Sequence, residues 1–297
     1  MPRAALLSIH ARVEGAGPGA LADPSLVQVW GPRYAAYVVA ADDRAVFTLG
    51  RLPSGGPRRR LAEELADRLA AYLGAGWMEY AAAGRALGEP PNRLRYAALT
   101  GRLVIRWNGA GRPTIHLVPR PDVDPAEARR ELARRHLRVF GPSTPEGFAR
   151  WAGIDLPDAH RAFGELGPTL LPARTPLGEG WLLAEDEPVV RMAPEPPAPA
   201  RLLPSGDAYT LLHDPGERAL LVPDAAARRR LWTPRVWPGA LLVGDEIVGT
   251  WRRAGPRVSI VPWRRLGSSE RAAVEAEAAS LPVPEAGRGI DVEWIEP

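Results

Sequence analysis

The chain has 297 residues, 45% of them hydrophobic and 25% charged, with a formal net charge of +3. This composition is typical of a globular protein and excludes a disordered or fibrous one. The absence of cysteine excludes disulfides, iron–sulfur clusters and thiol catalysis. The five histidines lack metal-ligand spacing and no apolar run is long enough to span a membrane, so we expect a soluble cytoplasmic protein without a metal or another cofactor.

The positive charge is concentrated in one segment. All 38 basic residues are arginine, and residues 51–120 hold 12 of them against 5 acidic residues, whereas residues 121–190 hold 8 against 12. A GC-rich genome explains the missing lysine but not this local excess. Because the planar arginine fork fits phosphate groups, the segment predicts contact with nucleic acid.

Residues 1–55 predict part of a winged helix-turn-helix unit. The pattern gives one helix, a short turn and a β-hairpin bent at Gly31-Pro32, over residues 3–13, 20–23, 26–30 and 34–40. A first helix is missing from the pattern. We therefore expect the chain to begin inside this unit, through truncation or through a start codon assigned downstream of the true one.

Residues 56–121 predict a complete winged-helix unit, with three helices followed by a β-hairpin. The helices are expected at 58–73, 77–87 and 92–99, and the strands at 103–107 and 114–118 around the turn Asn108–Gly111. In helix-turn-helix proteins the third helix enters the major groove of DNA. The start of the 92–99 helix is therefore the first candidate for DNA contact.

Residues 122–190 repeat the same order about 70 residues later, as one winged-helix unit would. Thr144 is a good N-cap with Pro145 at the first helical position, and Gly141-Pro142 ends the helix before it. The unit is expected to hold three helices and two strands, at 124–140, 145–153, 157–166, 170–173 and 181–184.

A Pro-rich stretch at 191–200 predicts a linker, and residues 201–297 predict a small β-rich domain. Its strands are expected at 209–212, 219–222, 240–243, 246–251, 258–262 and 290–294, with a helix at 269–279. Five of the ten tryptophans lie here and are expected in its core. The predicted fold class is thus α+β, with tandem winged helix-turn-helix units followed by a small C-terminal β-barrel-like domain.

Several motifs resemble those of the AlkZ/YcaQ-like proteins, in the same order along nearly the whole chain. They include Arg135-His136-Leu137 with Gly141-Pro142-Ser143-Thr144 and Phe148–Gly153, Leu202-Leu203-Pro204 with Asp207 and Tyr209, Gly249–Arg252, and more distantly Trp30–Asp43. The resemblance implies tandem winged-helix domains packed with a C-terminal β-barrel. Several members are DNA glycosylases that unhook interstrand crosslinks or remove bulky alkylated bases, and many others are known only as DNA-binding proteins.

The chain departs from this family where the chemistry is concerned. The resemblance places the family's Gln-apolar-Gln motif just ahead of the segment matching Pro2–Val13, which falls before Met1. The one glutamine, Gln28, lies on a wing strand, and the stretch Arg33–Tyr37 keeps the family's arginine but lacks its histidine. No catalytic residue is therefore assigned. We expect His136 to be a core histidine, and Asp207 to tie the linker to the last domain.

Ten residues are the candidates for contact with double-stranded DNA, including damaged duplex: Arg33, Arg58, Arg59, Arg60, Asn92, Arg93, Arg95, Arg102, Arg106 and Arg112. Three functions stay open at this level. The chain is a lesion-recognising glycosylase or its remnant, a non-enzymatic DNA-binding regulator or architectural protein, or a protein–protein scaffold.

Overall fold

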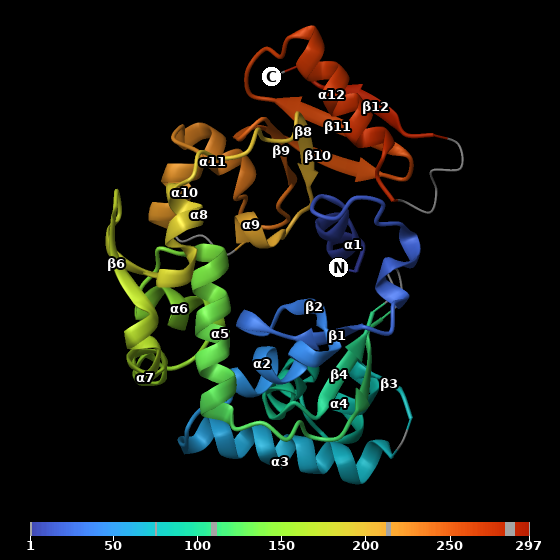
Figure 1. Cartoon of the computed structure of the whole chain (residues 1–297). Coiled ribbons are helices and arrows are strands. Elements are labelled where there is room, and N and C mark those ends of the chain that lie inside the picture. The colour runs from blue at the N-terminus through green and yellow to red at the C-terminus, as the bar shows by residue number, and fades with distance from the viewer. Residues whose placement is uncertain (1, 75, 108–111, 212–214, 283–288, 297) are drawn as a thin grey trace. The chain divides into compact units, whose positions relative to one another are not determined.

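The computed structural model describes residues 2–74, 76–107, 112–211, 215–282 and 289–296. These residues divide into two compact units, here called unit 1 (residues 23–192) and unit 2 (residues 2–22 and 193–297). Figure 1 shows the helices and strands of both in chain colours. The fold is α+β, as expected. The N-terminal helix α1 (Pro2–His10), which the pattern assigned to a unit at 1–55, groups instead with the C-terminal residues.

The first half of unit 1 is built on one five-stranded sheet, in the order β2-β1-β4-β5-β3. Its antiparallel strands are β1 (Leu26–Trp30), β2 (Ala36–Ala40), β3 (Met78–Glu79), β4 (Leu103–Arg106) and β5 (Thr114–Leu117). The pairing of β1 with β4 joins the two hairpins that the sequence placed in separate units. The turn expected at Asn108–Gly111 lies outside the described residues.

Helices pack on this sheet through a regular apolar stripe. Along α3 (Gly56–Leu73) the buried residues recur every three or four positions, as an amphipathic helix requires: Ala62, Leu65, Ala66, Leu69 and Leu73. The second expected helix starts later, as α4 (Tyr80–Ala86), because Met78 and Glu79 pair with β5. The third is the 3-10 helix η5 (Pro91–Thr100), whose C-terminal half is buried. Shorter helical segments are η2 (Pro32–Tyr34), η3 (Ala41–Asp43), α2 (Arg44–Thr48) and η4 (Leu49–Arg51).

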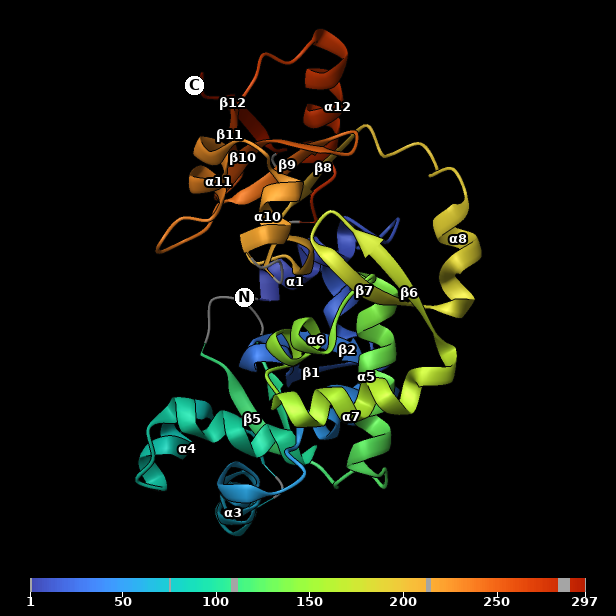
Figure 2. The same ribbon diagram turned by 90° about the vertical axis from the view of Figure 1, so that its left-hand side faces the viewer.

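The second half of unit 1 holds three helices and a hairpin, in the expected order. They are α5 (Pro125–Phe140), α6 (Pro145–Ala152), α7 (Leu156–Leu166), β6 (Leu170–Thr175) and β7 (Gly178–Leu183), followed by η7 (Ala184–Asp186) and α8 (Glu187–Arg191). Local capping fixes where the helices begin. Asp124 accepts hydrogen bonds from the backbone of Ala126 and Glu127, and Thr144 accepts one from Gly147. Figure 2 shows the hairpin beside α5.

The expected barrel of unit 2 is not closed. Its sheet has the order β12-β11-β10-β9-β8, so that β8 (Ala200–Leu203) and β12 (Asp291–Trp294) each have one neighbour among the described strands. A barrel requires these two edges to pair. The inner strands are β9 (Gly239–Val243), β10 (Glu246–Ala254) and β11 (Arg257–Pro262), and α12 (Ser268–Ala279) covers the sheet, which buries Val274 and Ala278 with Trp251.

Two expected strands of unit 2 are helices. Residues 209–211 lie in α9 (Ala208–Leu211), and residues 219–221 end α10 (Pro215–Leu221), whereas residue 212 lies outside the described part. Asp207 starts α9 by accepting a hydrogen bond from the Tyr209 backbone. Short apolar runs fit a strand or a helix equally well by periodicity, which explains the error. The remaining helices are α11 (Ala225–Leu231), η1 (Pro18–Ala22) and, in unit 1, η6 (Gly167–Thr169). None in the described ranges is long and apolar enough to cross a membrane.

Candidate DNA interface

The arginine-rich segment 51–120 has fewer free cations than its composition suggests. Each of its five acidic residues contacts an arginine. The pairs are Arg59–Glu63, Arg68–Glu64, Arg68–Glu89, Arg93–Glu89, Arg102–Asp67 and Arg112–Glu79. Four of the ten predicted DNA contacts are therefore ion-paired within this segment of the folded chain.

The expected recognition helix, η5, faces solvent only at its start. Leu94 and residues 97–100 are buried in the core, whereas Asn92 and Arg93 are exposed. Asn92 accepts a hydrogen bond from the Tyr80 hydroxyl at 3.1 Å, and Arg93 lies 3.4 Å from Glu89. Only the first turn of η5 can therefore meet a partner.

The three predicted wing arginines have different surroundings. Arg102 pairs with Asp67 at 2.5 Å, and Arg112 with Glu79 at 3.0 Å. Arg106 is exposed and places its guanidinium 4.2 Å from the centre of the Trp77 ring. This cation–π contact leaves the Arg106 charge uncompensated by a carboxylate in the described part of the chain.

The structure gathers three predicted residues that lie far apart in the sequence. Arg58 and Arg95 lie around Tyr34, which follows Arg33 in the chain, together with Arg51, which the sequence analysis missed. Arg95 donates to the Tyr34 carbonyl at 3.5 Å, and Arg58 pairs with Asp155 at 2.8 Å. We call this group the Tyr34 cluster; its members are Arg33, Tyr34, Arg51, Arg58, Arg95 and Asp155.

Arg51 is the buried centre of the Tyr34 cluster, with 1% of its surface exposed. It donates to the carbonyls of Ala152 at 2.7 Å and Trp30 at 3.0 Å, and its guanidinium lies 4.7 Å from the centre of the Tyr34 ring. Burial lowers the pKa of Arg51 to about 10. A lone arginine inside the apolar run at 49–53 was the one signal in the sequence.

The turn that carries Arg33 is strained. Arg33 and Tyr34 have φ angles of 55° and 57°, a left-handed conformation that costs a non-glycine residue roughly 1–2 kcal/mol. Arg33 is exposed, and no hydrogen bond or ion pair of its side chain occurs among the described residues. Arg60 is likewise exposed without such a partner, whereas Arg58 and Arg59 beside it are paired.

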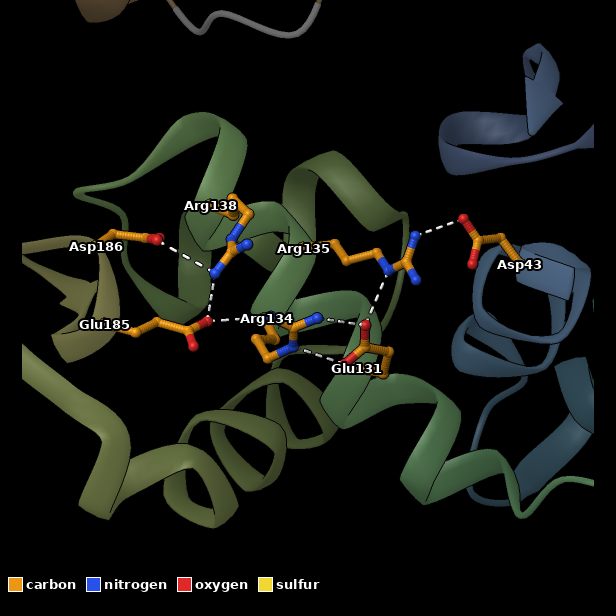
Figure 3. Close-up of polar contacts among 7 residues, drawn as sticks. All are labelled: Asp43, Glu131, Arg134, Arg135, Arg138, Glu185 and Asp186. Carbon is orange, nitrogen blue, oxygen red and sulfur yellow. Dashed lines mark hydrogen bonds and ion pairs between the residues drawn. The ribbon is translucent and has the colours of Figure 1, made fainter. Parts of the chain in front are cut away.

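A separate ion-pair network holds α5 in place. Glu131 accepts from Arg134 and Arg135, Arg135 reaches Asp43 in η3, and Arg134 and Arg138 reach Glu185 in η7 (Figure 3). Hydrogen bonds from Arg134 and Arg135 lower the pKa of Glu131 to about 2. The network joins segments of unit 1, and it presents no free base or acid for chemistry.

The side chains of the residue types that could serve in catalysis are engaged in hydrogen bonds within the fold. His136 is buried, its Nε2 lies 2.9 Å from the Ser143 hydroxyl, and burial lowers its pKa to about 3. Gln28 accepts a hydrogen bond from the Trp107 backbone at 3.0 Å. In unit 2, Asp207 is buried and accepts from Ser8 and from both Arg12 terminal nitrogens. No group of potential metal ligands occurs among the described residues.

The sequence analysis did not predict a second basic segment, because residues 191–297 as a whole hold 14 basic and 14 acidic residues. Residues 228–265 hold nine arginines against two acidic residues. Several of the nine are exposed on unit 2, namely Arg229, Arg230, Arg235, Arg252, Arg257, Arg264 and Arg265. A shorter window would have found this segment.

Three comparisons relate the chain to known proteins. The sequence model of the family described as "DNA glycosylase AlkZ-like" matches residues 1–282. The interstrand DNA cross-link repair glycosylase of Streptomyces sahachiroi is 26% identical over 162 residues, which cover 53% of this chain and 43% of that protein. The match thus spans less than half of this curated relative. The solved structure of the Streptomyces sahachiroi DNA glycosylase AlkZ is similar with a TM-score of 0.77 and 20% identity, over 99% of this chain and 89% of that one.

Proposed function

This chain belongs to the DNA glycosylase AlkZ-like family, and from that premise we propose that it binds double-stranded DNA carrying alkylated or cross-linked bases. The family match over residues 1–282 is the observation that carries the proposal. The relative from Streptomyces sahachiroi is named for the repair of interstrand cross-links, a lesion that exists only in duplex DNA.

The order of elements supports the finer assignment of the fold. Three helices followed by a two-stranded hairpin occur twice in unit 1, as in tandem winged-helix units. In such units the wing and the start of the third helix contact DNA. The exposed Arg93 and Arg106 occupy these two positions.

The predicted DNA contacts fall into two groups. Arg33, Arg60 and Arg106 carry charges that no carboxylate compensates in the described residues, so they are free to meet phosphates. Four others must first exchange a carboxylate for a phosphate, namely Arg59, Arg93, Arg102 and Arg112. We therefore assign the larger share of the binding energy to the first group and to the Tyr34 cluster.

Base excision is the family activity that this chain has to be tested for. Excision needs a group that positions or deprotonates water and stabilises the cationic sugar. The engaged side chain of Gln28 and the buried, neutral His136 favour a second candidate, a DNA-binding protein that does not cleave the glycosidic bond. Both candidates share the same DNA interface.

One experiment separates these functions. The purified chain is titrated against intact, alkylated and cross-linked duplexes over roughly 50–200 mM salt, and released bases are measured in the same samples. Tighter binding to the lesion with base release supports a glycosylase, and salt-sensitive binding without release supports the second candidate. Failure to bind any duplex would overturn the proposal and leave the scaffold function.

A further inference from the structure

The Tyr34 cluster holds four arginines and one carboxylate, and three of these arginines come from segment 51–120. The guanidinium groups of Arg51, Arg58 and Arg95 lie around Tyr34, and Asp155 is the only carboxylate that contacts any of the four arginines in the described part of the chain. Elsewhere in the segment each acidic residue neutralises an arginine. Cations held together without counter-ions destabilise a fold unless an anion joins them.

The backbone of Arg33 and the guanidinium groups of Arg51 and Arg58 lie around Gly153. Arg58 donates to the Gly153 carbonyl at 3.3 Å. A Cβ built on Gly153 would lie 3.6 Å from the Arg33 amide nitrogen and 3.8 Å from Nη2 of Arg51. The latter nitrogen is buried and has no hydrogen-bond partner among the described residues. Gly153 also has a φ of 70°, so a side chain there is disfavoured.

The strained turn fixes the backbone of Arg33. Four hydrogen bonds fix the backbone on both sides of Arg33. The Gly31 amide donates to the Ala35 carbonyl, the Tyr34 amide to the Gly31 carbonyl, and the Ala35 amide to the Pro32 carbonyl. The Arg95 guanidinium donates to the Tyr34 carbonyl. Gly31 packs so closely that a Cβ there would lie 2.8 Å from the Tyr37 ring. Backbone strain persists where surrounding contacts determine the conformation, and it occurs most often at functional sites.

We propose that Arg33 and Arg58 together bind one phosphate group of the DNA backbone, with the buried charge of Arg51 beneath them. This inference rests on the proposed function, which supplies the phosphate in the form of duplex DNA. Arg33 supplies a guanidinium group that is not ion-paired in the described residues, and Arg58 exchanges its contact with Asp155 for one with the phosphate. Binding relieves the repulsion among the arginines and requires no movement of the turn.

The first test measures duplex binding by fluorescence anisotropy as a function of salt. Arg33→Asn keeps a residue that tolerates the left-handed conformation, and Arg58→Gln removes the second cation. In the double variant the slope of log K against log salt falls by about 0.9, as for one lost phosphate, and affinity falls about tenfold at fixed salt. Arg191→Gln, an exposed position paired with Glu187, is the matched control and leaves both unchanged. An unchanged slope in the double variant overturns the proposal.

A second variant predicts a change in the opposite direction. Asp155→Asn keeps a good N-cap residue for α7 but removes the carboxylate that competes for Arg58. This variant binds duplex more tightly than the unaltered chain. A purely structural role for the Arg58–Asp155 pair gives equal or weaker binding instead, so that result also counts against the proposal.

The third test does not depend on DNA binding. Inorganic phosphate is added at constant ionic strength, and the melting temperature is followed for the unaltered chain, Asp155→Asn and the double variant. Phosphate stabilises all three proteins in a general way, so the result is the difference among their rises in melting temperature. A larger rise in the first two than in the double variant supports the site even if no duplex binds, whereas equal rises in all three overturn it.

Discussion

Arg93 and Arg95 are only two positions apart, yet different contacts surround them. Arg93 is about half exposed and lies beside Glu89. Arg95 donates to the Tyr80 hydroxyl at 3.2 Å and stacks near the rings of Trp30 and Tyr80. The sequence treats the two as a pair on one helix, whereas the structure leaves Arg93 exposed and packs the half-buried Arg95 against aromatic rings.

Single alanine variants should separate the two roles. We expect Arg95→Ala to lower the free energy of unfolding by about 1–2 kcal/mol, because the Tyr80 hydroxyl and the aromatic packing lose a partner. Arg93→Ala should change it by less than about 0.5 kcal/mol and yet weaken duplex binding and flatten its salt dependence. Urea unfolding and anisotropy measure the two effects, and equal destabilisation by both variants would contradict this division.

The buried His136 should make the protein less stable as the pH falls. Burial lowers its pKa from 6.5 to about 3 in the folded state, so the unfolded chain takes up a proton first as the pH falls. The free energy of unfolding should therefore fall from pH 6.5 towards pH 3, by at most about 1.4 kcal/mol per pH unit. Urea titrations of the unaltered chain and His136→Gln across this range measure the difference. An identical pH dependence in both would show that His136 does not titrate this way.

At the scale of elements, charges hold the C-terminal half of the helix α5 to two other segments of unit 1. Glu131 is the centre of this network, with Arg135 reaching η3 and Arg134 reaching η7 (Figure 3). Capping by Asp124 and the apolar stripe were visible in the sequence. The ion pairs join residues that are 51 and 92 positions apart, so no local pattern could predict them.

The network should stabilise α5 in a way that depends on salt. We expect Glu131→Gln to lower the free energy of unfolding by about 1 kcal/mol, because two arginines lose a shared acceptor. In about 1 M NaCl the loss should shrink, since screening there acts within about 3 Å. Glu179→Gln, whose contact with Arg174 is fully exposed, is the control and should have no measurable effect. A loss that is independent of salt would mean that packing, and not charge, is responsible.

At the scale of the whole molecule, the chain passes between the two units twice, near residues 22 and 192. The N-terminal helix α1 is fixed within unit 2 by Asp207, whose side chain is fully buried and bonded to Ser8 and Arg12. The sequence analysis expected Asp207 to tie the linker to the last domain. The structure shows that its main partners come from the opposite end of the chain.

Removal of this charge should release α1. We expect Asp207→Asn to destabilise unit 2 by about 2–3 kcal/mol, because Arg12 loses a buried bidentate partner. Trypsin should then cleave after Arg12 faster than in the unaltered chain, as mass spectrometry of the N-terminal peptide would show. Asp224→Asn, at the exposed N-cap of α11, is the control and should leave cleavage unchanged. Equal cleavage in both variants would contradict the role of Asp207.

The sequence by itself determined the features that depend on neighbouring residues. Helix starts at Asp124 and Thr144, the amphipathic stripe of α3 and the hairpins of both units follow from spacing and capping, and the motifs around His136 indicate the family. The tertiary structure decided the long-range ion pairs of the arginines, because partners such as Glu89 for Arg68 and Asp155 for Arg58 lie 21 and 97 residues away. It also decided that two hairpins share one sheet, that the sheet of unit 2 stays open, and that α1 belongs to unit 2. Each of these depends on pairing between distant segments, which a local pattern does not encode.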